Sequence, residues 1–159
     1  MATTSTLSSN PIEKLTQLCA QRTARTDRLH SAVRTLTDAL ETAGARPGEI
    51  SATVDGWTLS YDYVRSNVGQ RDCWSLCDDG GGYQEDGCTD LGLAVNHDGY
   101  LHGDFNSPVT GPTRAHLIAF GQRAAQFVEA ITAQLTHDVA ALDAAVEQVD
   151  SATEEVSHV

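Results

Sequence analysis

The sequence predicts an α+β fold in which a long N-terminal helix, a central antiparallel β-meander of about five strands and a long C-terminal helix follow one another. Two observations predict this order. Apolar residues recur at alternating steps of three and four positions near both ends of the chain, which is the helical period. Between these ends the period changes to two, as in strands with one buried face.

The first helix is expected over residues 11–44. Asn10 is a good N-cap, and Pro11 occupies the first helical position, where its missing N–H is not needed. Gly44 is a typical residue just past a helix end. The steps of three and four form a coiled-coil type of seam. Its residues expected to contact another helix are Leu29, Val33, Leu36 and Leu40.

The second helix is expected over residues 113–156. Gly111-Pro112 precedes it, and Thr113 can cap it. The seam continues through Val128, Ile131, Leu135, Leu142 and Val149. Because neither Gly nor Pro follows Gly121, the last part of this helix is expected to form an extended arm. Two such seams predict either an antiparallel helix pair within the chain or arms that meet other copies of it.

The central sheet is expected over residues 49–105. Asp55-Gly56 is a strong signal for a two-residue hairpin turn. The register that follows pairs Val54 with Trp57, Ala52 with Leu59, and Ile50 with Tyr61. All six side chains then share one face, which a helix must cover. A further strand over 71–77 and a second turn, Asp98-Gly99, between strands at 93–97 and 100–104 extend the meander.

The segment CWSLCDDGGGYQEDGC, residues 73–88, has three interpretations. A tight turn at Gly80-Gly81 would place Cys73 opposite Cys88, at a spacing that suits a disulfide. A metal site, if there is one, would use Cys73, Cys88, His97 and His102. The third interpretation is a solvated acidic loop. We expect no cofactor and no bound metal, because the cysteine spacing is not that of a zinc ribbon.

Composition limits the partners that the chain can have. The 159 residues are enough for a flexible polar tail, 1–10, and a single domain, 11–159. The formal net charge of −12 opposes direct binding to nucleic acid. No apolar run approaches the ~20 residues that span a bilayer, so no membrane contact is expected. The N-terminus lacks the features of a signal peptide, so we expect synthesis in the cytoplasm.

The function that these features favour is a non-enzymatic one. The sequence contains no nucleophile elbow, no dinucleotide-binding motif and no Walker A motif. Two long seams predict a structural or adaptor subunit whose partners are copies of itself or subunits of a larger complex, for example a virus particle. Two alternatives are a small metal-binding protein that uses the four residues named above and an acidic inhibitor that imitates nucleic acid.

Overall fold

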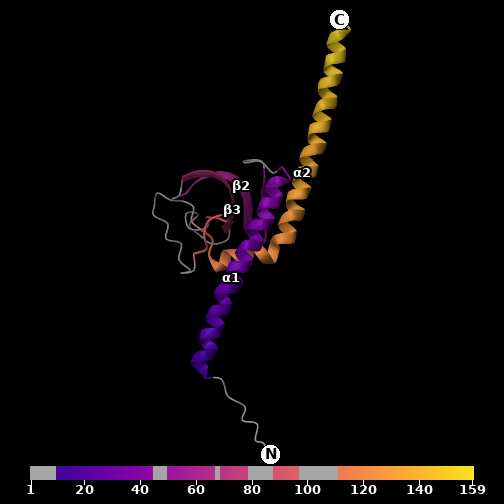
Figure 1. Ribbon diagram of the computed structural model, residues 1–159. Coiled ribbons are helices and arrows are strands. Elements are labelled where there is room, and N and C mark those ends of the chain that lie inside the picture. The colour runs from indigo at the N-terminus through magenta and orange to yellow at the C-terminus, as the bar shows by residue number, and fades with distance from the viewer. Residues whose placement is uncertain (1–9, 45–49, 67–68, 79–87, 97–110) are drawn as a thin grey trace, which may run out of the picture.

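Figure 1 shows the computed structural model, which describes residues 10–44, 50–66, 69–78, 88–96 and 111–159. Its elements in chain order are α1 (Pro11–Thr42), β1 (Ser51–Val54), β2 (Trp57–Ser66), β3 (Gly69–Asp78), β4 (Cys88–Asp90) and α2 (Arg114–Ser157). The predicted α+β order of helix, antiparallel sheet and helix is confirmed. The described residues form a four-stranded sheet of order β1-β2-β3-β4, so the predicted number of strands is one too high.

The strand expected at 93–97 is not formed over its described residues, 93–96, where Asn96 makes only an isolated parallel bridge with Thr113. A turn just before this segment ends β4. The Gly92 N–H donates to Asp90 Oδ1 at 2.8 Å, and the Leu93 N–H donates to the Asp90 carbonyl oxygen at 3.2 Å. An aspartate that accepts the N–H two residues ahead turns the chain and ends a strand. The expected turn Asp98-Gly99 and nearly all of the polar tail lie outside the described residues.

The ends of the helices follow the predicted local chemistry. Asn10 Oδ1 accepts the Ile12 N–H at 3.0 Å, and Pro11 occupies the first helical position. Gly44 has a φ of +107°, a conformation that favours glycine after a helix end. At the start of α2, Thr113 Oγ1 accepts the His116 N–H at 3.3 Å.

His116 completes a reciprocal cap at this end of α2. Its Nδ1 accepts the Thr113 N–H at 3.2 Å, so the ring serves the helix only while Nδ1 carries no proton. Burial lowers the pKa of His116 from its ordinary value, and the carboxylate of Asp78 only partly opposes this shift. A lowered pKa in the folded state means that the unfolded chain takes up the proton first as the pH falls.

Acid is therefore expected to destabilise the protein partly through His116. The stability that the neutral ring of His116 contributes is fully present above the ordinary histidine pKa of about 6.5. It is lost as the pH falls from there through the lower pKa of the folded state. His116→Gln keeps a residue that can complete the cap but cannot titrate. We expect the melting temperature of the wild type to fall more steeply below about pH 6.5 than that of this variant. Parallel pH profiles of the two proteins would contradict this role of His116.

The first hairpin has the predicted register. Val54 pairs with Trp57 and Ala52 with Leu59. Asp55 and Gly56 have φ values of 51° and 78°, as a type I′ turn requires. The predicted neighbour of Ile50 is also correct, because the Tyr61 N–H donates to the Ile50 carbonyl oxygen at 3.2 Å.

The register between β3 and β4 differs from the predicted one by four residues. Cys77, rather than Cys73, is the Cα partner of Cys88. The connection covers residues 79–87, which is longer than the two-residue turn on which the prediction relied. Because the difference is an even number of residues, it does not exchange the two faces of the sheet.

The core lies between one face of the sheet and the two helices. Leu59 and Leu76 are fully buried partners on β2 and β3, and Tyr61 stacks on Trp74 with 4.9 Å between ring centroids. From α2, Phe120 stacks on Phe127 at 5.6 Å. The other large buried apolar residues are Val33, Ile50, Leu91, Leu117 and Ile131. A helix therefore covers the apolar face, as predicted.

The two helices lie side by side only near the middle of the molecule and run in the same general direction (Figure 1). Arg114 Nε donates to Thr26 Oγ1 at 3.0 Å. Farther along both helices, a Cβ on Gly121 would lie 3.2 Å from Leu29 Cδ1, so this glycine allows the close approach. The antiparallel pair, one of the two predicted arrangements, is not formed. Within the described residues, neither helix is apolar enough over a sufficient length to cross a membrane.

Candidate functional site

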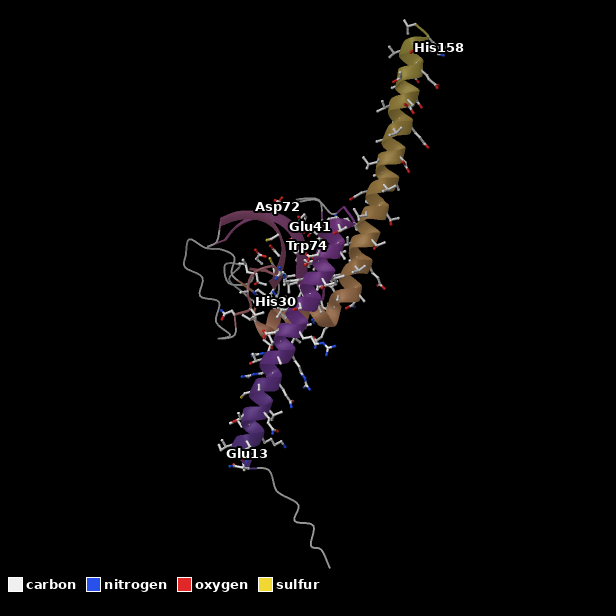
Figure 2. The ribbon with its side chains drawn as sticks, in the orientation of Figure 1. Glu13, His30, Glu41, Asp72, Trp74 and His158 are labelled. Carbon is white, nitrogen blue, oxygen red and sulfur yellow. The ribbon has the colours of Figure 1, made fainter. Side chains whose placement is uncertain are left out.

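Each helix extends beyond the core at one end. All of residues 11–25 of α1 and all of residues 135–157 of α2 are exposed. We call these segments the α1 arm and the α2 arm. Glu13 and His158, near the tips of the two arms, lie at opposite ends of the molecule (Figure 2). The arms of one chain therefore do not contact each other.

The α2 arm carries an apolar stripe without a covering element among the described residues. Its side chains are Leu135, Val139, Leu142, Val146, Val149 and Val156. They are between 44% and 75% exposed. Steps of four and three residues from Leu135 to Val149 are those of the seam in a coiled coil. A contiguous exposed stripe of this kind is a candidate surface for contact with another protein.

The α2 arm is also strongly acidic. Its six carboxylates are Asp138, Asp143, Asp150, Glu147, Glu154 and Glu155, and residues 132–159 contain neither Lys nor Arg. In the heptad that the stripe defines, the three aspartates directly flank the seam, whereas Glu147 and Glu154 lie on the outer face. Figure 2 shows side-chain oxygen atoms along this helix.

The α1 arm is apolar and basic. Ile12, Leu15 and Leu18 are between 51% and 66% exposed. At the base of the arm, Leu18, Leu29 and Ile118 line a groove of about 450 Å³ between α1 and α2. The arginines at this groove are Arg22, Arg25 and Arg114. An apolar floor with a cationic rim suits a partner that is both apolar and acidic.

The predicted seam residues divide into two groups. Leu29, Val33, Leu36, Leu40 and Ile131 pack in or against the core of their own chain. Val128 is half-buried. Leu135, Leu142 and Val149 are exposed on the α2 arm. Sequence reasoning did not identify the basic groove, because its arginines come from two helices that are far apart in the sequence.

The cysteines are arranged differently from the prediction. Cys19 and Cys73 carry thiols, whereas Cys77 is disulfide-bonded. The predicted Cys73–Cys88 bridge is therefore wrong, and Cys73 Sγ lies 3.7 Å from Ser75 Oγ in the interior. His97 and His102, the other members of the conditional metal site, lie outside the described residues. Within the part of the chain that the structure describes, no group of three or more His, Cys, Asp or Glu residues is placed to hold a metal ion.

We predict that the disulfide joins Cys77 to Cys88, which are Cα partners across β3 and β4. Non-reducing peptide mapping by mass spectrometry should find this link in the wild type and in Cys73→Ser, but not in Cys77→Ser. Closing so short a loop contributes about 2–3 kcal/mol, so reduction should lower the free energy of unfolding by that amount. A linked Cys73 peptide that survives Cys77→Ser would contradict the observed register.

A small polar cavity lies between α1 and the sheet. Its lining includes Glu41, Asp72, Trp74 and Asp90, and its volume is about 110 Å³. The Tyr61 hydroxyl donates to Glu41 Oε1 at 2.8 Å. Burial first, and then this hydrogen bond, raise the pKa of Tyr61 to about 12. Figure 2 shows Glu41, Asp72 and Trp74 in the middle of the molecule. Ligand sites are typically about 300–1,000 Å³, so this cavity is too small for most substrates.

No family model, no curated protein and no solved structure matches this chain.

Proposed function

We propose that this chain is a non-enzymatic structural or adaptor subunit that joins a larger protein assembly through its helical arms. The observation that carries this proposal is the apolar stripe of the α2 arm, which follows a coiled-coil heptad from Leu135 to Val156 with no cover among the described residues. At 1.5 Å per residue the stripe is roughly 33 Å long. Helices without tertiary contacts are only marginally stable in water, so a partner along the stripe would also stabilise the arm.

The magnitudes indicate that the stripe alone gives weak association. Complete burial of one apolar side chain contributes about 1.5–3 kcal/mol. If six residues each realised half of this, the gain would be about 5–9 kcal/mol. Association costs about 4–15 kcal/mol in lost rigid-body freedom, so the two terms nearly balance. A stable assembly therefore needs a second apolar surface, and the α1 arm with its groove supplies one.

The sheet supports this role because it fixes both helices to one core, from which the two arms extend in opposite directions. The Ser51 N–H donates to Gln134 Oε1 at 3.2 Å, and this contact ties β1 to α2 just before the α2 arm begins. His30 Nε2 lies 3.2 Å from the Leu91 carbonyl oxygen, which ties α1 to the chain after β4. A subunit with two anchored arms at opposite ends suits assemblies that repeat one chain, of which virus particles are an example.

Light scattering coupled to size-exclusion chromatography tests the proposal. The expected result is a mass above that of the 17.0 kDa chain, which rises with protein concentration. A mass of 17.0 kDa at every concentration, with the arms helical by circular dichroism, would contradict it.

A further inference from the structure

We propose that the partner of the α2 arm is a second copy of this chain, and that the α2 arm of each copy lies along the α1 arm and the basic groove of the other. This inference rests on the proposed function and specifies its partner. It starts from the difference in charge between two exposed arms that both carry apolar side chains.

The charge of the two surfaces is complementary. Residues 11–28 of α1 contain four basic residues, Lys14, Arg22, Arg25 and Arg28, and two acidic ones, Glu13 and Asp27. Their formal charge is therefore +2, in a chain whose net charge is −12. The α2 arm carries six carboxylates and no Lys or Arg. In an α1–α2 contact, Arg22 and Arg25 at the groove would meet the aspartates that flank the apolar stripe.

Pairing of two α2 arms is disfavoured by the same charges. The residues beside the seam set partner choice in coiled coils, and here they include Asp138, Asp143 and Asp150. Two α2 arms would bring these carboxylates together with no cation on either arm. Juxtaposed like charges oppose association and act against the wrong partner.

The geometry of the arms allows both contacts to form at once. The arms leave opposite ends of the molecule, so each must find its partner on another chain (Figure 2). Two copies placed side by side, with one inverted, bring each α2 arm beside the α1 arm of the other copy. A two-fold axis relates the two contacts, and this is the commonest symmetry of soluble oligomers. The segments match in length, because α1 from Pro11 to Leu29 covers roughly 28 Å and the α2 stripe roughly 33 Å.

Charge reversal on each arm tests the pairing. One variant carries Arg22→Glu and Arg25→Glu, and the other carries Asp143→Lys and Asp150→Lys. Each alone should associate about tenfold or more weakly than the wild type, because like charges then face one another. An equimolar mixture of the two should regain association, because each reversed arm then meets its complement. The matched control carries Glu147→Lys and Glu154→Lys on the outer face of the α2 arm and should change association little.

The measurement is sedimentation equilibrium at physiological salt, with circular dichroism to verify that each variant is folded. If the arginine variant associates as the wild type does, or if the mixture remains as weak as its components, the α1–α2 pairing is wrong. The proposed function would survive that result, because the wild type would still self-associate. A wild type that stays monomeric would instead overturn the proposed function itself.

Discussion

Replacing Leu142 and Val146 by aspartate should weaken self-association by about 100-fold or more, while the thermal stability of the monomer stays nearly unchanged. The two side chains are 65% and 57% exposed in the single chain and belong to the apolar stripe of the α2 arm. With half burial of each side chain, the two apolar groups contribute about 1.5–3 kcal/mol to one interface, and placing two carboxylates there costs about 1 kcal/mol or more in addition. Each tenfold in affinity corresponds to about 1.4 kcal/mol. Sedimentation equilibrium measures the first effect, and melting of dilute protein measures the second.

The control for this variant is on the same helix. Ala144→Asp with Gln148→Asp adds the same two charges on the outer face of the helix. Because alanine has the highest helix propensity, this control also lowers the stability of the helix. If the stripe is the interface, the control should retain most of the association. Equal losses in both variants would show that charge or helix stability, rather than the stripe, controls assembly.

Local chemistry explains which parts of the fold could be predicted from the sequence. The cap at Asn10, the cap at Thr113 and the turn at Asp55-Gly56 each depend on a few neighbouring residues. The period of apolar residues depends on one helix or strand at a time. The α+β order, the helix ends and the first hairpin register were therefore within reach of sequence reasoning.

The sequence did not allow prediction of features that depend on contacts between distant segments. The β3–β4 register depends on the length of the connection at 79–87, and the glycines there allowed a much shorter turn. The disulfide interpretation of residues 73–88 therefore paired Cys88 with Cys73 instead of Cys77. The relative direction of the helices is likewise absent from their individual patterns, because a stripe of apolar residues packs equally well in either orientation.

The candidate site also depends on tertiary contacts that the sequence pattern does not specify. Leu29 and Leu142 occupy equivalent positions in similar heptads, yet Leu29 packs against the core and Leu142 is exposed. The pattern indicates that a side chain seeks an apolar neighbour and does not say on which chain that neighbour lies. The basic groove was missed because it combines Leu18 and Arg22 of α1 with Ile118 of α2, far apart in the sequence.

Phe127→Ala should lower the free energy of unfolding by about 3–5 kcal/mol, because it removes a large side chain from a close-packed core. Phe127 has 0% exposure and stacks on Phe120, so the substitution leaves a cavity where α2 packs in the core. Domains are stable by about 5–15 kcal/mol, so this is a large part of the total. Urea denaturation of dilute protein, where association is minimal, measures it.

Val149→Ala provides the contrast on the same helix. Val149 is 64% exposed, so the free energy of unfolding of the monomer should change by less than about 0.5 kcal/mol. Its effect should appear in association, because the side chain belongs to the apolar stripe. Phe127→Ala should lower the free energy of unfolding directly. It should weaken assembly only indirectly, because α2 would no longer be held in place by its packing in the core. If Val149→Ala destabilised the dilute monomer as strongly as Phe127→Ala, the α2 arm would be part of the fold and would not serve as an interaction surface.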